Sequence, residues 1–297
     1  MKDTTLILGP GALGRLLATH LTSQAPLALV GRRNASDPLS LITPEGERLS
    51  CKVARITVDQ VPRQPAVVHL TTKAYDTQNA LNGLAPHIAP VTPLVLWQNG
   101  FRVQEPLTRH WQGPVLCATT TEGAYTQGES GVVHAGRGHT FIGHLDGRHR
   151  DLATRIATVL SQAGLAATPC DDIRQRLWHK LAVNAAINPL VARYRIRNGQ
   201  LRDRPFRPMV AALIDELDSI MRAENIPPPE DGWDIMIWKV IDATSNNRAS
   251  MLQDVLAGRP TERDAILGPL LEAAERHDIA TPHLIDATAS LEASVGR

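Results

Sequence analysis

The segment WHKLAVNAAINPL, residues 178–190, carries one amine and two amides at regular intervals within an otherwise apolar stretch. Lys180, Asn184 and Asn188 recur every four residues, which places them along one narrow face of an α-helix. A positioned ammonium group can stabilise negative charge that develops on an oxygen and can supply a proton to it. Because a buried polar group without a partner costs about 1–3 kcal/mol, this row must line a polar ligand site, pair with another domain or face water. The spacing alone does not choose among these.

Pro189 follows this polar row directly. Proline cannot donate a helical hydrogen bond, and it disfavours the α conformation of the residue before it. We therefore expect the row to end at a helix terminus or a kink near Asn188, where a ligand could be met.

A second chemical signal is GPGALG at residues 9–14, a G-x-G-x-x-G pattern. Gly9 would allow a tight strand-to-helix turn, Gly11 the close approach of a pyrophosphate, and Gly14 the packing of the helix on the strand. The helix that begins at Ala12 and Leu13 would direct its free N–H groups at the phosphates. The pattern predicts a dinucleotide-binding site, and the alternative is a glycine-rich turn without a ligand.

The end of the next strand pattern indicates which dinucleotide is bound. An acid there would bind the ribose of NAD, whereas a 2′-phosphate requires positive charge. Arg32 and Arg33 occupy this position, and the nearest acid, Asp37, lies further along the chain. The sequence therefore favours NADP(H), unless both arginines are solvated surface residues.

The elements that must position these residues divide the chain in two. Apolar strand patterns at 4–8, 27–31, 66–72, 93–99 and 114–121 alternate with helical ones at 12–22 and between residues 72 and 93. Residues 131–142 resemble a hairpin, and a helical pattern follows at 151–163. After residue 168 only helical patterns follow, at 171–188, 205–225, 233–244, 250–257, 264–277 and 281–293. We predict an α/β fold: a Rossmann-type dinucleotide-binding domain at 1–168 and an all-helical substrate-binding domain at 169–297.

Composition narrows the class of partner. The net charge is +1 and no basic block stands out, so neither a nucleic acid nor an anionic membrane surface is expected. No apolar run approaches the ~20 residues of a membrane helix, and three scattered cysteines fit a reducing cytoplasm. Histidines 134, 139, 144 and 149 match neither a helix nor a strand face, so we expect loop and surface histidines and no metal site. The oligomeric state, monomer or homodimer, stays open.

Several separated motifs resemble the ketopantoate reductase (2-dehydropantoate 2-reductase) family, nearly from end to end. They are GPGALG at 9–14, TKAYD at 72–76, QNG at 98–100, TTTEGA at 119–124, WHKLAVNAAINPL at 178–190 followed by NGQL, and NRASMLQDVLAGRPTERDAI at 247–266. The resemblance implies an enzyme that reduces 2-dehydropantoate to (R)-pantoate with NADPH, in a cleft between two domains. Other 2-oxo acids on the same scaffold, and an NADP(H)-binding regulator without turnover, are the alternatives.

The resemblance also implies residue roles. Lys180 matches the family's general acid, and Lys73 a lysine beside the cofactor. Asn99 matches an asparagine near both cofactor and substrate. The matched substrate contacts are Asn184, Asn188, Asn247, Ser250 and Glu262.

Two of these residues have simpler structural explanations. Ser250 begins S-x-x-Q, a capping box, and we expect it to cap a helix as well as to bind a substrate carboxylate. Glu262 follows Pro260 and Thr261, which suggest a helix start, so it could be only an acid in a first helical turn. With the resemblance, Glu262 is expected to accept a hydrogen bond from the substrate hydroxyl.

Overall fold

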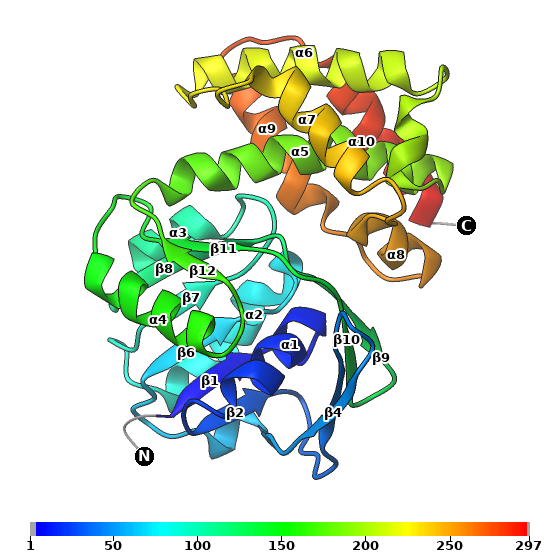
Figure 1. The fold of residues 1–297 in the computed structure, drawn as a ribbon. Helices are drawn as coiled ribbons and strands as arrows, with labels where there is room; N and C mark the ends of the chain where they lie inside the picture. The colour runs from blue at the N-terminus through cyan, green and yellow to red at the C-terminus, as the bar shows by residue number, and fades with distance from the viewer. Residues whose placement is uncertain (1–3, 296–297) are drawn as a thin grey trace. The chain divides into compact units, whose positions relative to one another are not determined.

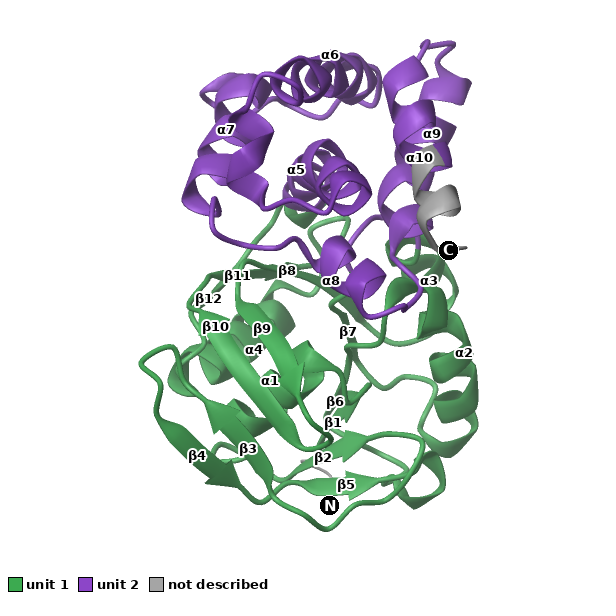
Figure 2. Cartoon of the chain, turned by 90° about the vertical axis from the view of Figure 1, so that its right-hand side faces the viewer, with its two compact units in different colours: residues 1–98, 103–174 green, residues 99–102, 175–297 purple. Residues whose placement is uncertain are grey.

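The computed structural model describes residues 4–295, and these form two compact units (Figures 1 and 2). Unit 1 comprises residues 1–98 and 103–174, and unit 2 comprises residues 99–102 and 175–297. The predicted boundary between residues 168 and 169 falls within strand β12, just before this division. Residues 99–102 are an excursion from unit 1 that sequence patterns did not indicate.

A twisted sheet forms the centre of unit 1, in the order β12-β11-β8-β7-β6-β1-β2-β5. Its strands are β1 (Thr5–Leu8), β2 (Leu27–Val30), β5 (Ala54–Ile56), β6 (Val67–Leu70), β7 (Leu94–Leu96), β8 (Val115–Thr120), β11 (Thr140–Gly143) and β12 (Ala167–Pro169). From β5 to β8 all neighbours are parallel, and β11 is antiparallel to β8. Taken in chain order, these six parallel strands have the 3-2-1-4-5-6 arrangement of a Rossmann fold, as predicted.

Helices cover both faces of this sheet. They are α1 (Ala12–Leu21), α2 (Ala74–Leu84), α3 (Gln104–His110) and α4 (Arg150–Gln162), with short 3₁₀ turns η1 (Val58–Gln60) and η2 (Ala85–His87). The chain runs from β1 to β2 in one direction and from β6 to β7 in the other, so right-handed crossovers put α1 and α2 on opposite faces. The order reverses between β1 and β6, and their carboxyl ends form the topological switch point where ligands bind in such folds.

A second sheet of order β4-β3-β10-β9 packs over α1. Its strands are β3 (Leu39–Ile42), β4 (Arg48–Cys51), β9 (Gly123–Gln127) and β10 (Gly131–Gly136). Leu16 and Leu17 of α1 share one buried core with Leu39 of β3 and Val132 of β10. The predicted hairpin over 131–142 is wrong, because β10 and β11 lie in different sheets. The hairpin is β9–β10, with Gly128 at φ +63° in its turn.

Unit 2 is helical, as predicted. It contains most of α5 (Ile173–Tyr194), then η3 (Asn198–Arg202), α6 (Arg207–Ala223), α7 (Gly232–Ala243), α8 (Ser250–Leu256), α9 (Arg263–Arg276) and α10 (Pro282–Val295). The expected helix terminus at Asn188 is wrong, since α5 continues through Pro189 to Tyr194, and the alternative expectation, a kink at this position, stays a prediction. Asn188, Pro189 and Leu190 are all buried, so tertiary packing outweighs the helical hydrogen bond that Pro189 cannot make.

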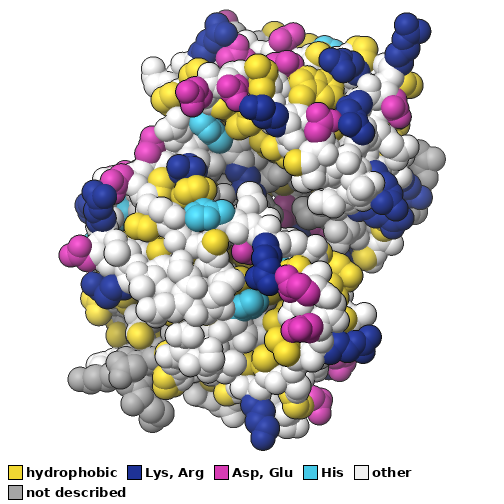
Figure 3. Space-filling model, in the orientation of Figure 1, with side chains coloured by type: hydrophobic (Ala, Val, Ile, Leu, Met, Phe, Trp, Pro, Cys, Tyr) yellow, Lys and Arg dark blue, Asp and Glu magenta, His cyan; other side chains and the backbone are white. Residues whose placement is uncertain are grey.

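The surface charge and the hydropathy of the helices bear on possible nucleic-acid and membrane partners. Basic and acidic side chains are interspersed over the face shown in Figure 3, in keeping with the net charge of +1. Within residues 4–295, none of the helices combines the length and the hydropathy required to cross a bilayer.

Candidate active site

Gly9 and Gly14 are required by the packing of the chain on itself. Gly9 has φ +115°, and a Cβ there would lie 2.7 Å from the amide nitrogen of Thr72. A Cβ on Gly14 would lie 2.0 Å from the carbonyl oxygen of Gly9 and 2.7 Å from Oγ1 of Thr71. The Thr71 hydroxyl donates to that same Gly9 oxygen at 2.8 Å. These two glycines therefore let β1, β6 and the start of α1 meet at the switch point.

Gly11 differs from both, and this difference tests whether a dinucleotide fits. Gly11 is the N-cap of α1 with φ −76°, a conformation open to any residue, and nothing lies within 4 Å of a Cβ built on it. Neither the fold nor the backbone conformation requires glycine there. Ala12 and Leu13 are the first two residues of α1, so their N–H groups have no acceptor within the helix, as a pyrophosphate site would require. The residues present thus fit a dinucleotide.

The positive charges at the end of β2 are not equivalent. Arg33 donates to Glu129 at 2.8 Å, and both side chains are strongly exposed. Arg32 is exposed and makes no hydrogen bond or ion pair within the described part of unit 1. Lys73 is the N-cap of α2, directly after β6 on the other side of the switch point, and does not cap the helix with its side chain. All three cofactor candidates therefore follow strands at the carboxyl edge of the sheet.

Arg15 is a residue near this edge that sequence reasoning missed. Its guanidinium donates to the carbonyl oxygens of Pro10, Gly128 and Gly131, each at 2.9 Å. It thereby ties the glycine loop to the β9–β10 turn, which also carries Glu129. No sequence pattern could reveal this, because the contact joins segments more than a hundred residues apart.

The polar row lies on α5. Lys180 and Asn184 are half-buried and Asn188 is 5% exposed, while Leu181, Ala182 and Ala185 between them are buried. Removal of its ammonium from water lowers the pKa of Lys180 to about 8, and the negative charge of Glu262 opposes this shift. A lysine with such a pKa can hold or release a proton near neutral pH, as a general acid must.

Glu262 and Asn99 meet in the same unit. Glu262 is 6% exposed. It is the N-cap of α9 and so lies just before the first helical turn, where the sequence analysis had placed it. Nδ2 of Asn99 donates to its Oε2 at 3.3 Å. Asn99 is half-buried and belongs to the excursion 99–102 of unit 2. The structure therefore gathers a lysine, a carboxylate and an amide within one unit.

Asn247 and Ser250 are both exposed and lie before and at the start of α8. The predicted capping box is wrong: Ala249 is the N-cap, without a side-chain cap, and Ser250 is the first helical residue. Nε2 of Gln253 instead donates to the carbonyl oxygen of Arg248 at 3.1 Å. The carbonyl of Asn247 accepts from the amide of Asn198 at 3.1 Å, so this loop is anchored through the NGQL segment. A substrate role for Asn247 and Ser250 stays a prediction.

The histidine expectation is partly wrong. His134 and His144 are each 2% exposed, and His134 lies in β10, where its Nε2 contacts Oε2 of Glu122 at 2.6 Å. The five-residue spacing gave no hint of burial because only His134 lies in a strand, His139 and His144 lie in connecting segments, and His149 is the N-cap of α4. Among the described residues, no three His, Cys, Asp or Glu side chains are arranged to hold a metal ion.

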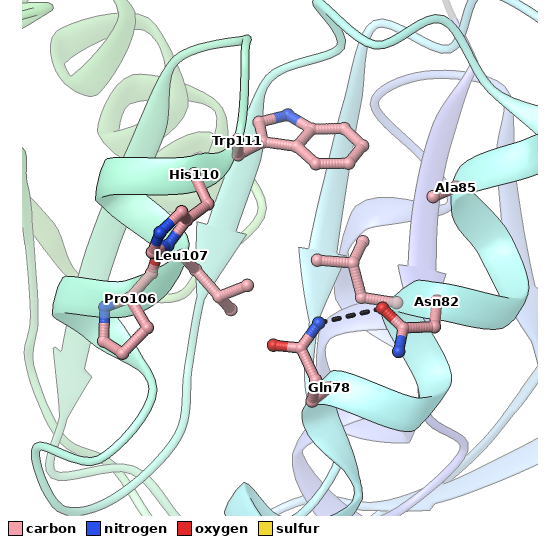
Figure 4. Close-up of a pocket in the computed structure, with 8 residues that line it drawn as sticks. Gln78, Asn82, Ala85, Pro106, Leu107, His110 and Trp111 are labelled. Atoms are coloured by element: carbon pink, nitrogen blue, oxygen red, sulfur yellow. Dashed lines mark hydrogen bonds between the residues drawn. The ribbon is translucent and has the colours of Figure 1, made fainter.

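A pocket of about 320 Å³ lies away from these residues, between α2 and α3 (Figure 4). Polar side chains that line it already have partners: Gln78 donates to Asn82 at 2.8 Å, and Nδ1 of His110 lies 2.7 Å from the backbone carbonyl oxygen of Pro106. None of the predicted site residues lines it.

Fold and site together define a two-unit α/β protein, with a dinucleotide-binding Rossmann unit and a helical unit in which burial lowers the pKa of a lysine. Residues 5–147 match the family described as "Ketopantoate reductase PanE/ApbA", and residues 172–292 match its C-terminal part. The chain belongs to this family.

Similar proteins agree with this assignment. The 2-dehydropantoate 2-reductase of Vibrio cholerae is 36% identical over 93% of each chain. The crystal structure of 2-dehydropantoate 2-reductase from Geobacter metallireducens superposes with a TM-score of 0.89, at 22% identity, covering 98% of this chain and 99% of that one. A structure of D-mandelate dehydrogenase with NADH has a TM-score of 0.86 at 21% identity, covering 99% and 98%, which shows the shared fold.

Proposed function

We propose that this protein is a cytoplasmic 2-dehydropantoate 2-reductase, which reduces 2-dehydropantoate to (R)-pantoate with NADPH on the route to pantothenate and coenzyme A. The observation that supports this most directly is the combination of Lys180, Glu262 and Asn99 in one unit of a chain whose full-length relatives bear that name. The glycine loop and Arg32 supply the means to hold the cofactor in the other unit.

The chemistry expected of these residues follows from their charges. NADPH, when bound, supplies a hydride to the C2 carbonyl carbon. The ammonium of Lys180 stabilises the negative charge that grows on the carbonyl oxygen and transfers a proton to it, which completes the hydroxyl, and the amine then regains a proton from water. Glu262 accepts a hydrogen bond from the substrate hydroxyl, with Asn99 holding the carboxylate.

The remaining polar residues bind and orient the substrate in this proposal. Asn184 and Asn188 extend the row of Lys180 along α5. The substrate carboxylate binds at the start of α8, where Ser250 and the preceding Asn247 lie. Orientation of this kind lowers the entropic cost of reaching the transition state.

A steady-state assay of NADPH consumption tests the proposal. We expect rapid consumption with 2-dehydropantoate and little with pyruvate or oxaloacetate. The shared fold of D-mandelate dehydrogenase makes another 2-oxo acid the second candidate, so 2-oxo-2-phenylacetate belongs in the panel. Preference for one of these acids would reassign the substrate, and NADPH binding without consumption of any of them would favour a regulator.

Cofactor choice provides a first prediction. Arg32→Ala should raise the Kd of NADPH by ~10-fold, the effect of one lost charge-assisted contact, and change that of NADH by less than ~2-fold. Arg33→Ala should have a smaller effect because Glu129 already neutralises part of its charge. Glu129→Gln, the matched control, should tighten NADPH binding. Equal losses for both cofactors, measured by fluorescence titration, would contradict the 2′-phosphate assignment.

The pH profile provides a second prediction. The pKa of Lys180 lies at about 8, below its ordinary value of 10.5, and the reaction needs the protonated amine. The rate constant kcat/KM should therefore be maximal below pH 8 and fall ~10-fold per pH unit above it. Glu262→Gln removes the charge that raises this pKa, so the break in the profile should move to lower pH. A break that stays in place in Glu262→Gln would show that another group titrates.

A further inference from the structure

The segment Asn99–Arg102 belongs to unit 2, and the residues on either side of it in unit 1 are hydrogen-bonded to each other. Nε2 of Gln104 donates to the carbonyl oxygen of Gln98 at 3.0 Å, and Gln98 in turn donates to the carbonyl oxygens of Leu70 and Thr72 at 2.9 and 3.1 Å. Gln98 and Gln104 are both buried. The ends of the excursion are therefore fixed in unit 1, whereas its tip is packed in unit 2.

A proline in α9 leaves the carbonyl of Ala265 without a helical donor, and this carbonyl accepts a hydrogen bond from the tip. In a helix the carbonyl of Ala265 would accept from residue 269, but Pro269 has no N–H. The amide of Phe101 donates to this carbonyl instead, at 3.1 Å. Gly100, at φ +82°, permits the approach, since a Cβ there would lie 1.9 Å from the same oxygen. Pro269 therefore leaves a carbonyl available, and Gly100 lets the amide of Phe101 reach it. The centroids of the Phe101 and Trp178 rings lie 5.3 Å apart.

Arg102 then fastens the segment to the surface of α9. Its Nε and Nη2 donate to the two carboxylate oxygens of Asp264 at 3.0 and 2.9 Å, and its Nη1 pairs with Glu272. Asp264, Gly268 and Glu272 follow at intervals of four and so share one face of the helix. A Cβ on Gly268 would lie 2.8 Å from Nη2 of Arg102, so glycine makes room for the guanidinium between the two acids.

We propose that Arg102 is a positioning residue for the reduction: it clamps the segment Asn99–Arg102 to α9 and thereby holds Asn99 against Glu262. The clamp joins Arg102 to Asp264, two residues after Glu262, while Asn99 reaches Glu262 itself at 3.3 Å. A two-ended attachment of this kind fixes the amide and the carboxylate in one geometry. The consequence for turnover rests on the proposed function, but the consequence for the segment does not.

Kinetics of Arg102→Ala test the consequence for turnover. We expect kcat/KM for the 2-oxo acid to fall ~10-fold, as for a slight misplacement of an orienting group, with the Kd of NADPH within ~2-fold of wild type. Arg102→Lys keeps the charge but loses the two-pronged contact, so it should recover only part of the loss. The matched control is Arg193→Ala, which removes an Arg–Asp pair of similar exposure in unit 2 and should leave kcat/KM unchanged.

A double-mutant cycle separates positioning from general stability. If Arg102 acts through Asn99, Arg102→Ala should change kcat/KM by less than ~2-fold when Asn99 is already alanine. The same ~10-fold loss in both backgrounds would overturn the proposal, because Arg102 would then act independently of Asn99.

Hydrogen exchange reports on the clamp without any turnover. The Phe101 amide should be protected in the wild type, and in Arg102→Ala residues 99–102 should exchange ~10-fold faster while α6 does not change. Unchanged exchange in this segment would overturn the proposal. A wild-type protein that consumes NADPH with none of the 2-oxo acids would instead refute the proposed function, and exchange would still decide whether the clamp exists.

Discussion

Lys180→Ala is expected to lower kcat by ~100-fold or more, because the variant lacks the group that protonates the substrate oxygen. NADPH affinity should stay nearly intact, since the predicted cofactor contacts other than Asn99 belong to unit 1. Single-turnover and steady-state kinetics with saturating NADPH measure the loss. It should appear in kcat more than in KM, as expected when an interaction forms mainly in the transition state.

The control for this variant is Lys239→Ala, an exposed lysine of the same unit that pairs with Asp231. It removes an equal charge and should leave kcat within ~2-fold, because exposed ion pairs contribute little. Turnover of Lys180→Ala close to wild type would show that Lys180 is not the acid.

The nucleotide-binding half was predictable because its signals are local. Strands such as Val67–Leu70 are buried on both faces and read as continuous apolar runs, and the glycine spacing marks the turn from β1 to α1. The second sheet was not predictable on the same grounds. Its strand β4 is largely exposed, and β3 pairs with β10, some ninety positions further along the chain. Short strands whose pairing is long-range leave no periodic pattern.

The candidate site was predictable as a set of residue types, but not as a geometry. The four-residue spacing put Lys180 and Asn188 on one face, yet Pro189 suggested a helix end that burial overrides. Nothing around Asn99 indicated that its segment would join the helical unit. One signal was present: Pro269 within a helical pattern leaves the carbonyl of residue 265 without a helical donor. The carbonyl four residues before such a proline is a candidate acceptor for a distant segment, and this criterion would have pointed to α9, although not to Phe101.

Gly11→Ala is the sharpest test of the cofactor site, because only a ligand can require this glycine. The fold should be unaffected, since a Cβ at Gly11 meets nothing within 4 Å and the backbone there is at φ −76°. The Kd of NADPH should nevertheless rise ~30-fold, which corresponds to ~2 kcal/mol for a methyl group forced against the pyrophosphate. Gly14→Ala is the control, because there the fold itself requires glycine. The added Cβ would lie 2.0 Å from the Gly9 carbonyl oxygen, so this variant should have a lower Tm. Tight NADPH binding by Gly11→Ala, measured by fluorescence titration with Tm unchanged, would mean that the pyrophosphate does not lie against this loop.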